Sequence, residues 1–424
     1  MIGLDDHGLL RRFFDEVGIG RMLINKTYPA NKISYQVVLP SNRINIYPER
    51  EKLFLELARE FPGKIESLRE SFIRWDNIAA GWQASQGNLY PLEKGWMNPR
   101  GLVKLLKDFF RAMKSREVIR RIEAGPERDF FDLQNTFLGA HLQGSDLPAL
   151  SEALIQNIGK RGTFRDPAGS HGLRTLMIQR FQEYGGKLIE NASVTGVENG
   201  SPEGLDLMAS DGSRVKTLFL ATTEGISSGV PGLPPRKKPA STGDPSLRYP
   251  LRFYIGMNER FVPVGMEDNL FMRRADGGGP LGLKNLYLAL NPTGSKEAPK
   301  GKRALTVTAL VTEKELTSLS QKLAKEVKED LLQALESVIP FLSEGMEFIL
   351  TDVNAGRGYR IPRAVGGGLT SWSPGILGRA AVRTTLKGKV FLLSPAPWEL
   401  GLEGEALTAL SAARILERIL RREG

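Results

Sequence analysis

Few residues in this sequence have the type and spacing that catalysis or metal binding requires. The three histidines, His7, His141 and His171, lie too far apart in sequence to suggest a metal site. The absence of cysteine excludes disulfides, thiolate metal ligands and cysteine nucleophiles. No H-E-x-x-H, Walker or G-x-S-x-G pattern occurs. Only His171 adjoins a tight turn, formed by residues 166–170, so it is the one histidine to test as a site residue.

The elements around that turn are the most informative part of the chain. Ser170 can cap a helix that starts near His171, whose buried side would carry Leu173, Leu176, Met177 and Phe181. Gly185-Gly186 ends this helix. The pattern then predicts strands over 187–197, 204–209 and 215–221, with turns at Asn199-Gly200 and Asp211-Gly212. The last strand is apolar and of the kind that is buried on both faces. The predicted order is therefore a helix, a small meander of strands and a return strand in a buried sheet.

The carboxy-terminal region predicts one strand followed by one helix. Residues 388–394 predict a short apolar strand. Residues 403–421 predict a helix with Leu407, Leu410, Ile415 and Leu416 on its buried side.

The amino-terminal part predicts mostly helices around one strand pair. A first helix reaches about residue 20, with Gly18 near its end, and a strand pair over 33–46 turns at Pro40-Ser41. Two helices over 49–78 are joined by a bend at residues 61–63. A basic amphipathic helix over 101–122 either packs on the core or lies on a membrane surface.

The region after residue 230 predicts a second mixed layer. Residues 231–250 are rich in proline and basic residues and indicate a linker. Strands are expected near 251–257, 286–290 and 304–310. A long helix follows, with a Thr312/Glu315 capping box at its start and Pro340 at its end. Its buried stripe would consist of Leu316, Leu319, Leu323, Val327, Leu331, Leu335 and Val338.

Several of these segments, taken in order, resemble one known family. They are PAGSHGLRTLMIQRFQEYGGKLIENASVTGVE (167–198), LDLMASDGSRVKTLFLATTEG (205–225) and GKVFLLSPAPWELGLEGEALTALSAARILERIL (388–420). The early stretch VVLPSNRINIYPEREKLFLELAREFP is similar as well. Their order and spacing resemble the phytoene desaturase and retinol saturase-like flavoproteins of the amine oxidase superfamily, which are FAD-dependent oxidoreductases.

The resemblance implies FAD as the cofactor and assigns residues to it. Val194 matches the position whose backbone approaches the adenine side of FAD, and Ala221 and Thr222 match the turn after the return strand. The loop and helix start near the flavin match Ser394, Pro395, Gly401, Leu402 and Gly404. Glycine lets backbone approach a ligand closely, and a helix amino terminus offers free N–H groups to it. The resemblance identifies no catalytic residue.

This sequence departs from the family pattern in three places. Ser394-Pro395 stands where the family usually has Gly-Asp, and Glu403 and Glu405 would compete with an anionic ligand for the helix dipole. The family's opening strand, G-x-G-x-x-G turn and helix are not found. Residues 18–20 (Gly-Ile-Gly) close a helix instead of opening one, so they form a helix C-cap.

These features together predict an α/β (α+β) fold. It combines an FAD/NAD(P)-binding-like discontinuous domain lacking its first βαβ unit with a mixed α+β substrate domain. The expected parts are a substrate and helical region (1–160), a flavin-domain part with a β-meander (161–230), a substrate-domain sheet and long helix (231–360), and a carboxy-terminal flavin-domain part (361–424).

The predicted function is that of one chain of an FAD-dependent oxidoreductase acting on a mainly apolar substrate, with hydride passing between the substrate and the flavin. A separate protein subunit carrying a GxGxxG dinucleotide-binding unit would complete it as a hetero-oligomer. A non-catalytic subunit with a degenerate flavoprotein fold, and a peripheral lipid-binding protein, are the alternatives. Substrate, direction and electron acceptor stay open.

The composition restricts the expected binding partners and cellular location of the chain. A net charge of +10 favours anionic partners, but the basic residues are scattered and no nucleic-acid-binding signature occurs, so no nucleic-acid partner is expected. The amino terminus does not resemble a signal peptide, and no run is apolar enough to span a membrane. A cytoplasmic location is expected, with contact at the inner face of the membrane as an extension of the lipid-binding alternative.

Overall fold

The computed structural model divides the chain into two compact units, each assembled from three stretches of sequence. The first comprises Met1–Gly81, Phe110–Leu173 and Thr242–Thr370, and the second comprises Trp82–Phe109, Arg174–Ser241 and Ser371–Gly424. The structure describes residues 4–5, 8–20, 31–86, 119, 122–139, 148–164, 170–199, 204–223, 230–231, 233, 247–278, 282–295, 297–312, 314–316, 324–352, 359–360, 382–385, 389–393 and 402–423.

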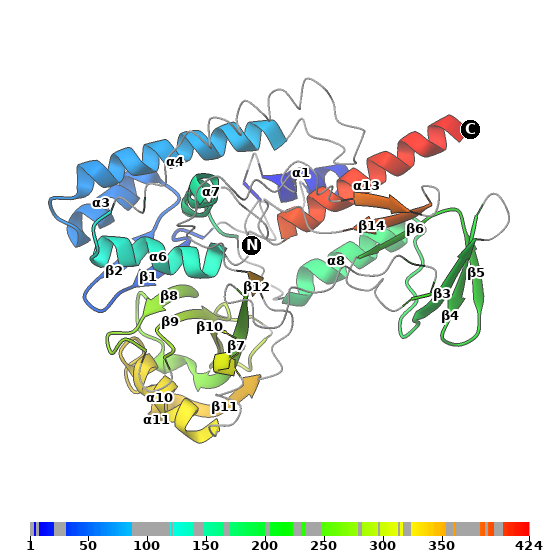
Figure 1. Ribbon diagram of the computed structural model, residues 1–424. Helices are drawn as coiled ribbons and strands as arrows, with labels where there is room; N and C mark the ends of the chain where they lie inside the picture. The colour runs from blue at the N-terminus through cyan, green and yellow to red at the C-terminus, as the bar shows by residue number, and fades with distance from the viewer. Residues whose placement is uncertain are drawn as a thin grey trace. The chain divides into compact units, whose positions relative to one another are not determined.

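The first unit is built on a mixed sheet of eight strands (Figure 1). The strands are β1 (Tyr35–Val38), β2 (Arg43–Ile46), β7 (Leu247–Asn258), β8 (Asn269–Arg273), β9 (Asn285–Leu290), β10 (Lys302–Val311), β11 (Met346–Asp352) and β12 (Tyr359–Arg360). Their order is β11-β7-β10-β9-β8-β1-β2, with β12 paired to β7. Only β1 and β8 pair in parallel among these described strands, so their carboxyl ends share one edge of the sheet.

The predicted turn between β1 and β2 is confirmed. The Leu39 N–H donates to the Asn42 carbonyl over 2.8 Å, which closes a two-residue loop at Pro40-Ser41. Proline fixes the backbone torsion φ that such a turn needs and has no N–H to leave unpaired. The strands themselves alternate as expected, because Tyr35 and Val37 pair with Ile46 and Ile44 and all four side chains are buried.

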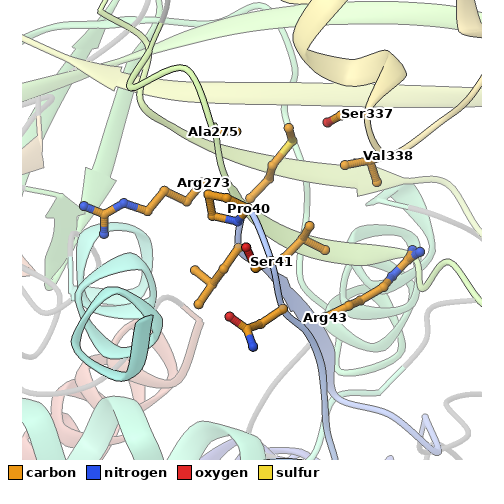
Figure 2. A pocket seen from close by; sticks show the side chains of 11 residues that line it. Pro40, Ser41, Arg43, Arg273, Ala275, Ser337 and Val338 are labelled. Atoms are coloured by element: carbon orange, nitrogen blue, oxygen red, sulfur yellow. The ribbon is translucent and has the colours of Figure 1, made fainter. Parts of the chain in front are cut away.

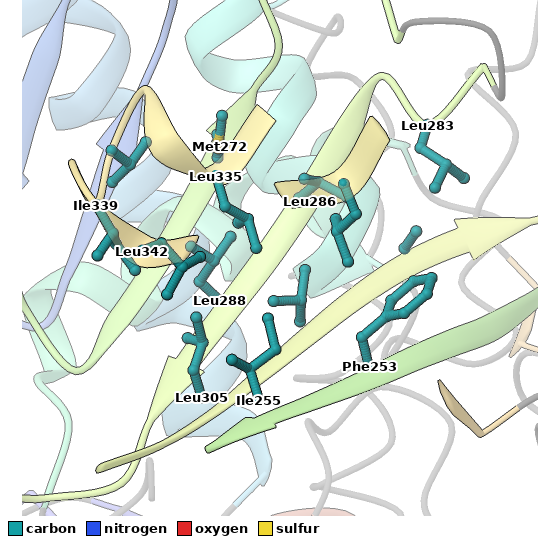
Figure 3. Packing of buried hydrophobic residues seen from close by; sticks show 14 of the residues in the cluster. Phe253, Ile255, Met272, Leu283, Leu286, Leu288, Leu305, Leu335, Ile339 and Leu342 are labelled. Carbon is teal, nitrogen blue, oxygen red and sulfur yellow. The ribbon is translucent and has the colours of Figure 1, made fainter. Parts of the chain in front are cut away.

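One face of the sheet packs against α10 (Ala324–Glu336) and α11 (Leu342–Gly345) and forms the main core (Figure 3). Alternate residues of the strands supply it, such as Leu286, Leu288 and Leu290 on β9, because successive strand side chains point to opposite faces. Helix α10 contributes the buried residues Val327, Leu331 and Leu335, in agreement with the predicted stripe.

The predicted capping box before this helix is also confirmed. The Thr312 N–H donates to Glu315 Oε2 over 2.6 Å, and the Glu315 N–H donates to Thr312 Oγ1 over 3.2 Å. These bonds satisfy backbone donors that the start of a helix would leave unpaired. The predicted positions Leu319 and Leu323 of the stripe lie outside the described residues.

Helices cover the second face of the sheet at the β2, β1 and β8 end. They include α3 (Arg50–Glu60), which contacts β2, and α6 (Pro126–Leu138), which contacts β8. The ring of Phe137 on α6 stacks on Phe271 of β8 at 5.7 Å between centroids. Helices α4 (Ile65–Gln86) and α6 share a buried aromatic cluster through Trp75 and Phe131. The bend predicted between α3 and α4 is present at Gly63, where φ is +83°.

At its other end the same second face is more open. The side chains of Tyr254, Phe348 and Leu350 are exposed on β7 and β11. They share this face with Thr306 and Thr308 of β10, because Thr306 pairs with Tyr254 and Tyr254 pairs with Leu350. The first unit therefore carries a partly apolar sheet surface beside its helix-covered region.

Two further elements complete the described part of the first unit. Helix α1 (Leu9–Glu16) ends two residues before Gly18, whose φ of +78° fits the predicted helix C-cap. Helix α7 (Pro148–Arg161) precedes the described residues 162–164. The linker predicted over 231–250 is wrong at its end, because β7 begins at Leu247 and includes Pro250. Pairing of Pro250 with Leu310 of β10 places this proline inside the strand.

The second unit contains two small sheets. The strands β3 (Val194–Asn199), β4 (Leu205–Ala209) and β5 (Arg214–Thr217) form an antiparallel meander. The other sheet has the order β13 (Val382–Thr385), β14 (Val390–Leu393), β6 (Leu220–Thr223), and β14 and β6 run in parallel. The hairpin turn predicted at Asp211-Gly212 is confirmed, with Gly212 at a φ of +82°.

Two strand predictions in this unit are wrong. Residues 186–193 are irregular, so the first strand begins at Val194 and not at Lys187. The strand predicted over 215–221 is two strands in different sheets, β5 and β6, because the chain crosses between the sheets at Leu218 and Phe219. Apolar composition cannot reveal such a crossing, since both segments have the same local pattern.

The long helices of the second unit are α8 (Ser170–Glu183) and α13 (Leu402–Glu423). Helix α13 matches its prediction, with Leu410 and Ile415 buried. The buried side predicted for α8 is wrong, because Leu173, Leu176 and Met177 are only half-buried and Phe181 is 50% exposed. Its ring lies over Gly186, where an added Cβ would come within 2.4 Å of the ring, so Phe181 contacts backbone at the helix end and not the core.

None of the described helices has the length and apolar character needed to cross a membrane. The basic helix predicted over 101–122 lies outside the described residues apart from Ile119 and Ile122, so its prediction stands untested.

Candidate functional site

The carboxyl ends of β6 and β14 lie together at one edge of the second unit's parallel pair. Leu220 pairs with Val390 and Thr223 pairs with Leu393, so both strands end in register. Ligands of open α/β sheets bind outside the carboxyl ends of the strands, where the following loops and helices diverge. This edge is therefore the candidate site of the second unit.

Apolar layers cover both faces of this strand pair. On one face Val390 and Leu392 cluster with Leu220 and with Val197 and Leu205 of the meander. On the other face Phe391 clusters with Ala412 and Ile415 of α13. Coverage on both faces is typical of a parallel sheet, and it leaves the strand ends and the strand edges as the accessible parts.

Strand β6 forms one edge of this sheet within the described part of the chain. The Leu220 N–H donates to the Lys389 carbonyl over 3.0 Å, so the backbone groups of Leu220 face β14. Successive residues of a strand direct their N–H and C=O groups to opposite sides. The backbone groups of Ala221 consequently point away from β14, toward the open edge.

Helix α13 extends well beyond the strand that precedes it. Its 22 residues span about 33 Å at the α-helical rise, whereas the four residues of β14 span about 13 Å. The helix packs on Phe391 from Ala412 onward, so its first turns lie past the carboxyl edge of the strands. There Glu403 is only 1% exposed, whereas Glu405 is exposed.

A buried carboxylate at this position changes what the helix start can bind. The helix dipole stabilises negative charge near the amino terminus, and Glu403 already supplies that charge. A carboxylate accepts hydrogen bonds and has no donor of its own when ionised. The start of α13 therefore suits hydroxyl groups better than a phosphate.

The predicted site residues fall into three groups in the structure. Ala221 and Thr222 lie in β6 opposite Phe391 and Leu392, and Leu402 and Gly404 lie in the first turn of α13. Val194 begins β3 and is exposed, in the meander and not in the sheet of β6 and β14. Ser394, Pro395 and Gly401 lie outside the described residues, as does the side chain of His171. The assignments to FAD stay predictions.

Sequence reasoning missed Phe391 and Leu392 at this site, and it named Glu403 without predicting that its side chain is buried. The two strand residues form the covered centre of the parallel pair, and Glu403 is the buried acid at the helix start. Helical periodicity could have found Glu403, because it lies four and seven residues before the predicted buried positions Leu407 and Leu410, whereas Glu405 is not at helical spacing from them.

The first unit offers the second surface of functional interest, on the open part of its sheet. Burial raises the pKa of Tyr287 to about 12, so its hydroxyl stays protonated and donates a 2.7 Å hydrogen bond to Asn269 Oδ1. Burial likewise raises the pKa of Tyr35, whose hydroxyl donates to Gln134 Oε1. Both tyrosines lie on the second face beneath helices, whereas Tyr254 and Leu350 are exposed for contact.

No protein-family profile matches the sequence, and no curated protein is significantly similar to it. Solved structures, in contrast, are similar over nearly the whole chain. A putrescine oxidase variant redesigned in its cofactor binding has 14% sequence identity and a TM-score of 0.53, with 97% of this chain and 86% of that chain covered.

Two other solved structures show the same likeness. Cyclohexylamine oxidase from Brevibacterium oxydans IH-35A is 14% identical with a TM-score of 0.51, and the match covers 99% of this chain and 87% of that one. An oxidoreductase from Methanosarcina mazei is 14% identical with a TM-score of 0.54, at 97% and 86% coverage. At this identity the likeness is one of fold. The chain therefore has the fold of these amine oxidases and related oxidoreductases across almost its full length.

Proposed function

We propose that this chain is the larger part of an FAD-dependent oxidoreductase that acts on a mainly apolar substrate. The observation that carries the proposal is the parallel pair β6 and β14, with its carboxyl ends in register and α13 starting beyond them. The fold shared with putrescine oxidase and cyclohexylamine oxidase supports it, as does the resemblance of residues 167–198, 205–225 and 388–420 to desaturase-like flavoproteins.

The residues at this edge fit part of an FAD molecule. Ala221 and Thr222 are small and lie in β6 within two residues of its carboxyl end at Thr223, close to where a ligand would bind. Glu403 can accept hydrogen bonds from the ribityl or ribose hydroxyls of FAD, in place of the acid that the Gly-Asp pattern normally supplies. A bound flavin would supply the capacity to accept or donate a hydride, while this chain binds and orients it.

A partner polypeptide with a dinucleotide-binding unit is the second element of the proposal. Among the described residues, the sheet containing β6 and β14 has a third strand only in the antiparallel β13. The backbone groups of Ala221 point outward from β6, and an added parallel strand would pair with them. Such a strand could bring the phosphate-binding turn that residues 18–20 do not form, because Gly18 closes α1.

The open sheet surface of the first unit is the proposed place for the apolar part of the substrate. Tyr254, Phe348 and Leu350 present aromatic and aliphatic side chains there, with the hydroxyls of Thr306 and Thr308 beside them. Apolar pockets with a few polar groups are the usual lining of small-molecule sites. Tyr254→Asp and Leu350→Asp should each raise KM for an apolar substrate, whereas Val264→Asp on an exposed turn should not.

The test is an absorption spectrum of the chain purified alone and after co-expression with small GxGxxG proteins encoded nearby. Flavin bands that bleach on reduction, appearing only in the co-purified complex, are the expected result. A chain that stays monomeric and colourless beside every such protein would refute the proposal. If the chain purified without a partner binds FAD, the flavoenzyme part of the proposal stands and the partner subunit is refuted.

A second candidate function is a non-catalytic subunit that keeps the fold as a scaffold. Ser394-Pro395, which replaces the family's Gly-Asp, favours it, as do Glu403 and Glu405, which would compete with an anionic ligand for the helix dipole. The same spectrum separates the two candidates. A stable complex with a partner that never shows flavin bands would identify the scaffold.

A further inference from the structure

A cavity of about 310 Å³ opens in the first unit at the carboxyl ends of the parallel strands β1 and β8 (Figure 2). Val38 of β1 pairs with Met272 of β8, and the chain leaves both strands at this point. The turn at Pro40-Ser41 forms one wall, and Ser337 and Val338, which follow α10, form another. The volume lies in the range of small-molecule sites, which begins at about 300 Å³.

The charged side chains that line the cavity are both arginines, Arg43 and Arg273. Figure 2 shows them on opposite sides of the Pro40-Ser41 turn. Arg273 is neutralised, because its Nη1 lies 2.7 Å from Asp129 Oδ1 on α6. Arg43 donates one 3.2 Å hydrogen bond to the neutral Gln36 Oε1 and forms no ion pair with a described residue. It thus retains both its charge and most of its guanidinium donors.

The carboxylates near the turn are already engaged. Glu60 accepts hydrogen bonds from the Asn42 side chain at 3.1 Å and from the Arg43 N–H at 3.3 Å, and it forms an ion pair with Arg59. Glu56 pairs with Arg59 as well, at 2.8 Å. These contacts leave the guanidinium of Arg43 as the charge available to a ligand in the cavity.

The remaining lining is suited to an apolar group. Met272 and Val338 are buried members of the core between the sheet and α10, and Val38 packs against the same core. Ser337 Oγ donates to the Ala334 carbonyl over 2.7 Å, so it can only accept a further hydrogen bond. The cavity therefore combines the guanidinium of Arg43, which has no ion-pair partner among the described residues, with an apolar lining.

We propose that this cavity binds a small organic anion, whose carboxylate or phosphate group pairs with Arg43 while its apolar body lies against Val338 and Met272. The planar guanidinium is shaped for two-pronged hydrogen bonding to either anion. The site is built by the first unit alone and uses none of the residues assigned to FAD, so it stands or falls independently of the proposed oxidoreductase function.

Calorimetric titration of the full chain with four probes tests this site. Hexanoate and hexyl phosphate carry both features, hexanol lacks the charge, and inorganic phosphate lacks the apolar body. Binding of at least one of the first two, at least tenfold tighter than of the last two, is expected. The stronger of the two identifies the preferred head group.

Variants locate the binding. Arg43→Gln should weaken it at least tenfold, Arg43→Lys should weaken it less, and Ala275→Phe at the cavity wall should block it while leaving Arg43 in place. Arg214→Gln, which removes an exposed arginine from β5, is the matched control and should bind like the wild type. Circular dichroism confirms that each variant is folded. Absence of binding by both anions, equal binding of hexanol, or unchanged binding in Arg43→Gln would overturn the proposal.

Discussion

Ala221 of β6 lies directly opposite Phe391 of β14, yet its backbone N–H and C=O groups point away from that strand. Ala221 is exposed, whereas Phe391 is buried, and the backbone of Ala221 faces an edge that is open among the described strands. Its neighbour Thr222 has the reverse backbone orientation and faces β14. This alternation gives the partner proposal a sharp test, because proline removes a single N–H.

Ala221→Pro should leave the fold of the isolated chain intact and abolish co-purification with a strand-adding partner. The lost N–H faces the open edge, so the free energy of unfolding should change by no more than about 1 kcal/mol. Thr222→Pro removes an N–H that faces β14 and should cost about 1–3 kcal/mol. Urea denaturation and affinity co-purification measure the two effects. A partner that still binds Ala221→Pro does not add a strand at this edge.

Glu403 and Glu405 should respond very differently to the same change. Glu403→Gln removes a buried negative charge from the start of α13 and should lower the free energy of unfolding by about 1 kcal/mol. It should also weaken flavin retention in the assembled complex, because Glu403 is the proposed acceptor for the cofactor's hydroxyls. Glu405→Gln changes an exposed side chain, so the free energy of unfolding should change by less than about 0.5 kcal/mol and the complex should retain its flavin. Thermal melts and flavin release on dilution distinguish these outcomes.

Asp330→Asn should strongly destabilise the first unit. Asp330 is 8% exposed on α10 and accepts two hydrogen bonds from Arg274, at 2.7 and 2.8 Å, while Arg274 is itself 2% exposed. The substitution removes the more buried of the two carboxylates that pair with Arg274, which should cost about 1.5–3 kcal/mol. Asp276 also pairs with Arg274 but is 52% exposed, so Asp276→Asn should cost less than about 1 kcal/mol. Equal losses in chemical denaturation would contradict this assignment.

Asp76 should make the stability of the first unit depend on pH in the acid range. Burial by itself raises the pKa of Asp76, but hydrogen bonds and charge from Arg50 and Lys160 outweigh it and hold the pKa below its usual value. A carboxyl group with a lowered folded-state pKa stabilises the fold above its unfolded pKa of about 3.9. That contribution is lost as the pH falls through the folded-state pKa.

The wild type and Asp76→Asn should therefore differ most in stability at neutral pH and converge below about pH 3. Urea midpoints measured from pH 7 to pH 2.5 give this difference directly. A constant difference across the range would show that Asp76 acts through its shape and not through its charge. Asp211→Asn in the exposed turn of the second unit is the control and should show no such convergence in the first unit's transition.

Local patterns in the sequence determined much of the secondary structure. The Pro40-Ser41 turn, the Thr312/Glu315 capping box and the left-handed Gly18 just after α1 all occur as predicted. Each depends on a few neighbouring residues, because proline, glycine and capping side chains restrict the backbone wherever they stand. The buried stripes of α10 and α13 followed from helical periodicity in the same way.

Tertiary structure alone decided which strands became neighbours and so where the sites lie. The apolar residues over 215–221 look like one strand. Only Leu220–Thr223 pairs with β14, whereas Val215 belongs to the meander and is exposed. The parallel partners of β6 and β8 are 170 or more residues away along the chain. Burial and long-range pairing depend on what the rest of the chain brings alongside, and no local pattern carries that information.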